Sequence, residues 1–238
     1  MSREHDVAVE KSQRKPGRAE REAERRKSIL RAAVDVFSRK GYQGCRIADV
    51  AREAGVAYGL VYHYFKNKDE LLEDVFSSGW SGFLSRVQAG ITRETSLEAQ
   101  VRAVVQVAFE AYRRDPRGVK VLILEVGRSP AGGAVSRGSA FTHVVQLAAE
   151  MFRAAQARGE LSSALDPVLC ATSLFGVIEM ALTSFVVGLL DRRDEQLIDR
   201  ARDQVAETIL RGLVGAGPSP AEAPWNRSVP KPKTARRD

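Results

Sequence analysis

Apolar residues recur every three or four positions along most of the chain, which is the spacing of amphipathic α-helices. The first such stripe contains Ile29, Ala33 and Phe37, and Gly41 is expected to end its helix. The sequence has no hairpin dipeptide between alternating apolar and polar runs, and no repeat period. The pattern therefore predicts an all-α protein.

Two short helices are predicted next, joined by a tight turn. The first places Ile47 and Val50 toward a core, and the second has Val61 and Phe65 on its inner face. Gly55 suits the turn because glycine tolerates a positive φ. Two helices of about two turns in this order match the helix-turn-helix, in which the first helix braces the second against the major groove of DNA.

Capping signals mark the starts of the longer helices that follow. An N-cap residue with a glutamate three positions later, or with a proline directly after it, favours a helix start. Such pairs are Asn67 with Glu70, Thr95 with Glu98, and Asp166 with Pro167. The predicted segments are a long helix from 67, a helix from 95 to about 114, an apolar segment 119–126, a loop 127–138, and helices 141–158, 166–190 and 192–213.

These patterns divide the chain into four segments. Residues 1–21 are polar and are expected to form a mobile basic arm. A three-helix helix-turn-helix domain occupies 22–66, and a helical body of about six helices occupies 67–215. The basic, proline-rich tail 216–238 is expected to be disordered.

The distribution of charge indicates which segment meets a polyanion. Residues 1–66 contain 15 Lys and Arg against 9 Asp and Glu, whereas residues 91–215 contain 15 of each. A basic segment beside a neutral body indicates a nucleic-acid partner for the first segment. Ordinary solvated charge is the alternative interpretation.

Other function classes find little support in the sequence. No uncharged apolar run reaches the roughly 20 residues of a membrane span, and no secretory signal follows Met1. Cys45 and Cys170 lie far apart, so we expect a cytoplasmic protein without metal or cofactor. The three histidines fit no catalytic motif, and no catalytic residue is predicted. An enzyme, or an architectural protein that coats DNA without sequence preference, remain the alternatives.

A dozen or more residues within about 50 positions form a known pattern. They read Ile29-Leu30-x-Ala32-Ala33-x-x-x-Phe37, Gly41-Tyr42, Ile47-Ala48-Asp49-Val50-Ala51-x-x-Ala54-Gly55-Val56 and Gly59-x-x-Tyr62-x-Tyr64-Phe65-x-x-Lys68-x-x-Leu71. This pattern resembles the TetR family of transcription regulators. The sequence departs from it at Cys45, Arg46 and Ala57, where the family usually has Ser or Thr near a helix start; loss of such a cap weakens a helix by ~1 kcal/mol.

The second short helix supplies the candidate DNA contacts. If Val61 and Phe65 face inward, the residues from Ala57 to His63 lie outward or beside them, and the backbone at Gly59 can approach DNA. The resemblance implies backbone contacts for Tyr62, His63 and Lys68 and base contacts for 57–60. The candidates are Arg46, Ala57, Tyr58, Gly59, Leu60, Tyr62, His63 and Lys68. Packing within the three-helix unit is the alternative for Tyr62 and His63, and the preferred interpretation for Tyr64.

The body is similar to the family's C-terminal domain, which implies an effector pocket and a homodimer. In the family the last two long helices pair with their copies, here 166–190 and 192–213. The candidate pocket residues are Trp80, Phe83, Val105, Phe109, Tyr112, Leu122, Glu125, Phe141, Val145, Phe152, Phe175 and Glu179. Aromatic residues at helical spacing are more often core than ligand contacts. Glu125 and Glu179 would be costly if buried unpaired, so each is expected to bind a polar ligand group or an internal arginine.

Two further stretches narrow the resemblance. Leu122-Ile123-Leu124-Glu125 with Arg128-Ser129, and Leu174-Phe175-Gly176-Val177-Ile178-Glu179, look like the fatty-acid-metabolism regulators of the family. Those proteins respond to long-chain acyl-CoA. The resemblance implies a repressor that a small hydrophobic effector releases from a palindromic double-stranded operator.

Overall fold

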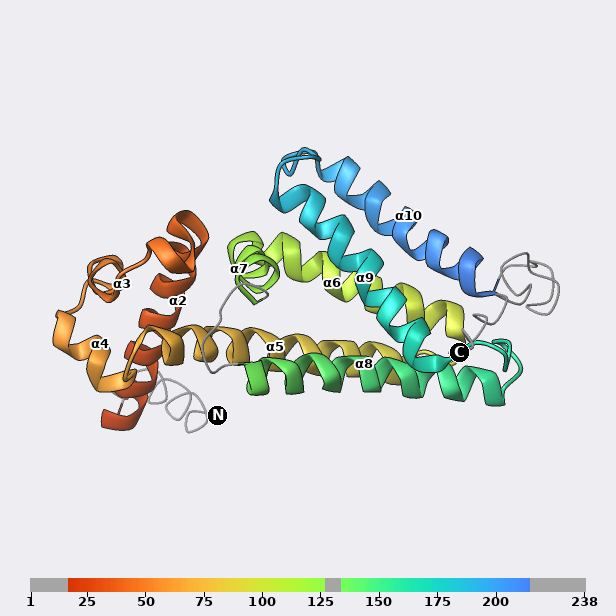
Figure 1. Ribbon diagram of the computed structural model, residues 1–238, viewed down its shortest axis with the longest axis horizontal. Helices are drawn as coiled ribbons and strands as arrows, with labels where there is room; N and C mark the ends of the chain where they lie inside the picture. Colours follow the sequence, from red (N-terminus) through yellow and green to blue (C-terminus); the bar gives the residue numbers. More distant parts are fainter. Residues whose placement is uncertain (1–16, 127–133, 215–238) are drawn as a thin grey trace, which may run out of the picture. The chain divides into compact units, whose positions relative to one another are not determined.

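Helices make up the regular structure of residues 17–126 and 134–214, which the computed structural model describes (Figure 1). Side chains are described there except those of 125, 126, 134–141 and 214. The helices are α2 (Arg18–Gly44), α3 (Ile47–Ala54), α4 (Tyr58–Tyr64), α5 (Lys68–Arg93), α6 (Leu97–Arg114), α7 (Pro116–Val126), α8 (Ala134–Ala157), α9 (Pro167–Val186) and α10 (Glu195–Val214). The all-α prediction is confirmed.

The chain folds into two compact units, which are described separately. The first contains α2, α3, α4 and α7, with α5 as far as Ser85, the end of α6 from Glu110 and the start of α8. The second contains the remaining parts of α5, α6 and α8 together with α9 and α10. The first unit therefore includes more of the chain than the segment 22–66 assigned to the helix-turn-helix domain.

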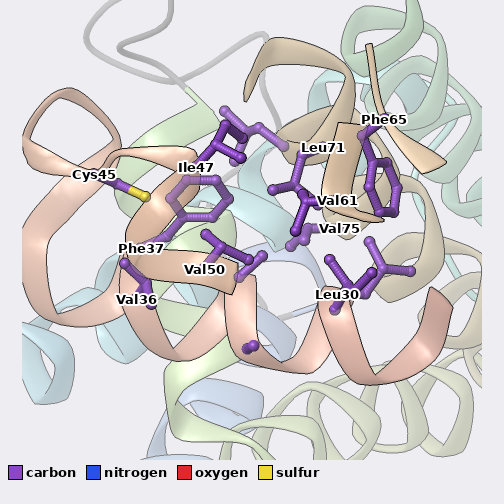
Figure 2. Packing of buried hydrophobic residues seen from close by; sticks show 14 of the residues in the cluster. Leu30, Val36, Phe37, Cys45, Ile47, Val50, Val61, Phe65, Leu71 and Val75 are labelled. Carbon is purple, nitrogen blue, oxygen red and sulfur yellow. The ribbon is translucent and has the colours of Figure 1, made fainter. Parts of the chain in front are cut away.

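One apolar core joins the helices of the first unit (Figure 2). Ile29 and Phe37 of α2, Val50 of α3 and Phe65 after α4 are each at most 1 % exposed. Leu71 brings the first turn of α5 into the same core. Burial of a side chain of this size stabilises a fold by about 1.5–3 kcal/mol, so this cluster fixes how α3 and α4 stand against α2. The predicted inward positions of these helices are confirmed.

The helix α2 begins earlier than the apolar pattern indicates. The backbone N–H of Gly17 donates to Glu20 Oε2 at 2.6 Å and satisfies a free donor of the first turn. Residues 18–21 are therefore helical and do not belong to an irregular arm, while the other residues of the predicted arm lie outside the described range. At the other end Gly41 interrupts the helix as predicted, with a φ of 70°.

The start of α5 follows the predicted capping box only in part. Asn67 Oδ1 accepts a hydrogen bond from the N–H of Glu70 at 2.8 Å, as the spacing suggests. The Glu70 carboxylate, however, accepts from the N–H of Lys66 at 2.6 Å rather than from that of Asn67. The hydrogen bonds at this helix start thus reach back one residue further than predicted, to Lys66, and hold the segment that connects α4 to α5.

The predicted capping box at Thr95 is wrong. Ser96 Oγ accepts from the N–H of Ala99 at 3.2 Å, and the acid that satisfies Leu97 N–H is Glu160, at 2.5 Å. Glu160 follows α8 and also pairs with Arg158 at 2.5 Å, and these two interactions, Arg158 first, lower its pKa. The capping acid comes from a segment that is distant in sequence, which a local pattern cannot reveal.

The predicted start of α9 is confirmed. Asp166 Oδ1 accepts hydrogen bonds from the N–H groups of Val168 and Leu169 at 2.8 and 2.9 Å. The helix ends at Val186, four residues before its predicted end, because Gly188 adopts a φ of 81° that closes the last turn.

Two other boundaries also differ from the prediction. The helix α8 begins at Ala134, so part of the predicted loop 127–138 is helical and residues 127–133 lie outside the described range. The helix α10 begins at Glu195 rather than Arg192, since Asp194 Oδ1 caps it by accepting from Leu197 N–H at 2.8 Å.

In the second unit α9 and α10 pack against each other. Their buried side chains include Leu174, Ile178, Phe185, Ile198, Val205 and Ile209.

Candidate nucleic-acid interface and effector-binding residues

The helix α3 is held in place by its apolar face and by one carboxylate. Asp49 accepts a hydrogen bond from Arg46 N–H at 3.1 Å and pairs with Lys40 Nζ of α2 at 2.8 Å. These contacts, that of Lys40 first, lower the pKa of Asp49. Although the usual hydroxyl cap is missing, the side chain of Asp49 still satisfies a free N–H at the helix start.

Two glycines lie in this region, Gly55 in the turn between α3 and α4 and Gly59 within α4. The backbone conformation requires a glycine only at Gly55. Gly55 has a φ of 65°, and the N–H of Val56 returns to Ala51 O at 3.0 Å. An added Cβ at Gly59 would meet no atom within 4 Å, so packing does not require a glycine there. Gly59 and Ala57 are exposed and leave the backbone at the start of α4 accessible, as the sequence predicts.

The helix α4 has one buried and one exposed face. Val61 and the following Phe65 are 0 % and 1 % exposed, whereas Tyr58 and Tyr62 are 54 % and 44 % exposed. His63 is also exposed, and Leu60 is half-buried. The exposed positions are therefore those that the inward placement of Val61 and Phe65 predicts.

The two exposed tyrosines form a pair. Tyr58 Oη and Tyr62 Oη lie 3.2 Å apart, and their rings meet edge to face with centroids 5.1 Å apart. The hydrogen bond with Tyr58 raises the pKa of Tyr62. A tyrosine hydroxyl can both donate and accept hydrogen bonds, which suits contacts with phosphates and base edges.

Lys68 lies in a different environment from the one predicted. Its Nζ donates to Tyr42 O at 2.8 Å and to Cys45 O at 3.1 Å, and lies 4.2 Å from the centre of the Tyr42 ring. The Tyr42 hydroxyl in turn donates to Asp69. Two of the three ammonium donors are thus engaged within the protein. The structure gives Lys68 a bracing role between α5 and the end of α2, which the sequence did not reveal.

The remaining residues of this region separate into buried and exposed groups. Cys45 is buried, and burial raises the pKa of its thiol to about 11, so the helix start does not activate it. The side chain of Arg46 is exposed, as a phosphate contact requires. Lys66, two residues after α4, is exposed, and its side chain forms no ion pair in the described part of the chain. It is a candidate phosphate contact that the sequence interpretation missed, although the sequence alone places this lysine close to the end of the second short helix.

The candidate effector residues of the first unit gather partly in an aromatic row. The Trp80 ring is tilted against that of Phe76 and meets that of Phe83 edge to face, with centroids 5.6 and 5.4 Å apart. Trp80 and Phe83 are half-buried, as is Leu122, and Tyr112 is buried. The indole N–H of Trp80 is buried and has no hydrogen-bond acceptor in the described part of the chain. The side chains of Glu125 and Phe141 lie outside the described residues.

The candidates of the second unit are core residues with one exception. A buried set comprises Val105, Phe109, Val145, Phe152 and Phe175. Glu179 is exposed on α9, contrary to the expectation of an acid held in an apolar interior. The reason is that the buried face of α9 passes through Phe175 and Ile178, and Glu179 lies outside it.

One stripe along the exposed side of α9 contains only apolar or small residues. Leu169, Ser173, Gly176 and Met180 lie on one side, at helical spacing, and all are exposed. We call these four residues the α9 stripe. The opposite side of α9 is buried and apolar. Among the described helices, α9 is also the one that is long and apolar enough to cross a membrane by length and composition alone, a test that core helices pass too.

Comparison with known proteins agrees with this arrangement. Residues 29–75 match the model of the family described as "Bacterial regulatory proteins, tetR family". The fatty acid metabolism regulator protein of Bacillus subtilis (strain 168) is 26% identical over 159 residues, which cover 67% of this chain and 82% of that protein. The regulator UidR of Escherichia coli (strain K12) is 25% identical over 191 residues, 80% of this chain and 91% of UidR.

Solved structures share the fold. FadR from Bacillus subtilis, crystallised with stearoyl-CoA, matches with a TM-score of 0.70 and 24% identity over 78% of this chain and 97% of FadR. AibR, crystallised with isovaleryl coenzyme A and operator DNA, matches with a TM-score of 0.65 and 20% identity over 80% of this chain and 98% of AibR.

An all-helical chain with an exposed helix-turn-helix and a separate helical unit defines a DNA-binding transcription regulator. Through residues 29–75 the chain is similar to the TetR family of bacterial regulatory proteins. The relatives and solved structures named above include regulatory proteins crystallised with acyl-CoA ligands.

Proposed function

We propose that the protein is a homodimeric repressor that binds a palindromic operator and is released by a small hydrophobic effector. The outer face of α4 carries this proposal. Tyr58, Tyr62 and His63 are exposed there, while Val61 and Phe65 anchor the helix in the core. Tyr62, Arg46 and Lys66 would contact phosphates, and Tyr58, Leu60 and His63 would contact base edges.

The α9 stripe supports the homodimer. Leu169 and Met180 are 67 % and 66 % exposed, and Ser173 and Gly176 between them allow close approach of another helix. An apolar helix face of this length is stable in water when a second apolar surface covers it. A second copy of α9 supplies such a surface and generates a two-fold axis that matches a palindrome. Two recognition helices then enter major grooves about one helical turn, ~34 Å, apart.

A fatty acyl-CoA is the effector that we propose. The Bacillus relatives named above regulate fatty acid metabolism or were crystallised with stearoyl-CoA. The apolar candidates near Trp80 suit an acyl chain, and the unpaired indole N–H would gain an acceptor from a thioester or amide carbonyl. The effector releases DNA only if it binds the DNA-free conformation more tightly.

Selection of bound duplexes from a random pool tests the proposal. The expected product is a palindromic sequence that scrambled competitor DNA at equal concentration does not displace. Release is then measured with palmitoyl-CoA, free palmitate and coenzyme A alone. An affinity that ignores sequence would identify the architectural alternative, and release by none of the three compounds would exclude the acyl-CoA effector.

A further inference from the structure

The first turns of α2 precede the region that matches the family. The match begins at Ile29, whereas α2 begins at Arg18, so about three helical turns come first. The side chains from Arg18 to Lys27 are all exposed, and the apolar face of the helix starts only at Ile29. These turns contribute no buried side chain to the core of the first unit.

The acidic side chains of these turns are already engaged. Glu20 accepts from the N–H of Gly17 at 2.6 Å, and Glu22 pairs with Arg18 at 3.1 Å. Glu24 pairs with Arg31 at 2.5 Å. Each carboxylate in the segment therefore has a partner within α2 or at its cap.

Two arginines on one side of α2 are left over. Arg21 and Arg25 are four residues apart and so lie one above the other on the helix surface. Neither has an acidic partner within ion-pair distance among residues 17–126 and 134–214. Like charges at this spacing destabilise a helix slightly, so the pair does not stabilise α2. We call Arg21 and Arg25 the arginine pair.

The neighbouring Arg26 locates the arginine pair relative to α4. Its guanidinium lies 5.4 Å from the centre of the Phe65 ring, directly after α4, and bonds to Asp74 of α5 at 2.5 Å. Figure 1 shows the first turns of α2 continuing past the end of α4. Arg25 is adjacent to Arg26, and Arg21 lies five residues, about 7.5 Å, further along the helix. The turns of α2 that carry the pair therefore lie near Phe65, at the C-terminal end of the recognition helix.

We propose that Arg21 and Arg25 form a second DNA-binding surface, which contacts the phosphates flanking the bases that α4 reads. Guanidinium groups bind phosphates in a bidentate manner and retain their charge at any physiological pH. Phosphate contacts carry no sequence information, so this surface adds affinity and fixes register without altering base preference. The inference rests on the proposed function of α4.

The test is the salt dependence of DNA binding by the full chain. We would compare wild type with Arg21→Gln/Arg25→Gln on the selected operator and on a random duplex of equal length. The slope of log K against log salt should become shallower by about 0.9 for each phosphate that is no longer neutralised, hence by about 3.6 for a dimer. The ratio of operator to random-duplex affinity should stay unchanged. Arg21→Lys/Arg25→Lys, which keeps the charge, should retain most of the slope.

A matched control removes the same charge elsewhere. Arg192 and Arg193 are exposed between α9 and α10, and Arg192→Gln/Arg193→Gln should leave the slope at the wild-type value. An unchanged slope in Arg21→Gln/Arg25→Gln, or an equal change in the control, would overturn the inference. A wild-type protein without sequence preference would instead refute the proposed function, and the random-duplex slopes would still judge the arginine pair.

Discussion

Two regions of the molecule expose large apolar or aromatic side chains, and they differ in chemistry. On α4 these are Tyr58 and Tyr62, whose hydroxyls lie 3.2 Å apart. On α9 and the residues that follow it they are aliphatic. That second set comprises Val168, Leu169, Val177, Met180, Val187 and Leu189, from 37 % to 77 % exposed.

The difference indicates two kinds of partner. Tyrosine combines an apolar ring with a polar end and so suits a surface that is partly wet, such as the groove and phosphates of DNA. Aliphatic side chains offer no hydrogen bond and gain free energy only when water is removed from them, which requires another apolar surface. The same measure, exposure, thus marks a nucleic-acid face on α4 and a protein face on α9.

The largest effect is expected from a charge placed within the α9 stripe. Met180→Asp should convert the dimer to a monomer, because a carboxylate buried between two apolar helices lacks a partner. Loss of the second DNA-binding unit should lower operator affinity by about 10²–10⁴-fold. Sedimentation equilibrium and operator titration measure the two effects. Ala164→Asp, an exposed position before α9, should change neither; a Met180→Asp protein that stays dimeric would refute the role of the stripe.

The second effect concerns the frame that holds α4. Lys68→Met should reduce the free energy of unfolding by about 2 kcal/mol, because the ammonium donates to Tyr42 O and Cys45 O in the part-buried end of α2. Urea denaturation measures it. Lys66→Met, two residues earlier and exposed, is the matched control and should unfold like wild type. If instead Lys68→Met is as stable as the control but loses DNA binding, Lys68 acts at a phosphate, as the sequence suggested.

A smaller change is expected at the tyrosine pair. Tyr62→Ala should weaken operator binding by about tenfold, or ~1.4 kcal/mol, without affecting stability, since the side chain is 44 % exposed and outside the core. Tyr62→Phe separates the two parts of the side chain, because it keeps the ring and removes the hydroxyl. Fluorescence anisotropy with a labelled operator measures both variants. Equal affinity in wild type and Tyr62→Ala would place the DNA face elsewhere.

The sequence predicted those parts of the fold that depend on residues close together along the chain. Helical spacing in Ile29, Ala33 and Phe37, and the Asp166-Pro167 pair, act within a few residues, and the corresponding elements are confirmed. The errors arose where a partner came from elsewhere. Leu97 is capped by Glu160, 63 residues away, so no local pattern could identify that acid.

The candidate site shows the same limit. The outward positions of α4 followed from the two inward residues Val61 and Phe65, and the structure agrees with them. Lys68 was assigned to DNA because of its position in the family pattern. Its contacts with Tyr42 and Cys45, 26 and 23 residues earlier, exist only once α2 and α5 have packed together.

The smallest predicted effect tests how firmly α3, the support of α4, is tied to α2. Because its contacts lower the pKa of Asp49 in the folded state, ionised Asp49 stabilises the fold above its unfolded pKa of about 3.9, and this contribution disappears as the pH falls through the lower folded value. Asp49→Asn should therefore melt at a lower temperature than wild type at pH 7, and the two melting curves should converge below about pH 4. Lys40→Met removes the first partner of Asp49 and should show the same convergence. A difference in melting temperature that persists unchanged to pH 3 would mean that the ion pair contributes nothing to holding α3 and that burial of Ile47, Val50 and Ala51 alone supports the recognition helix.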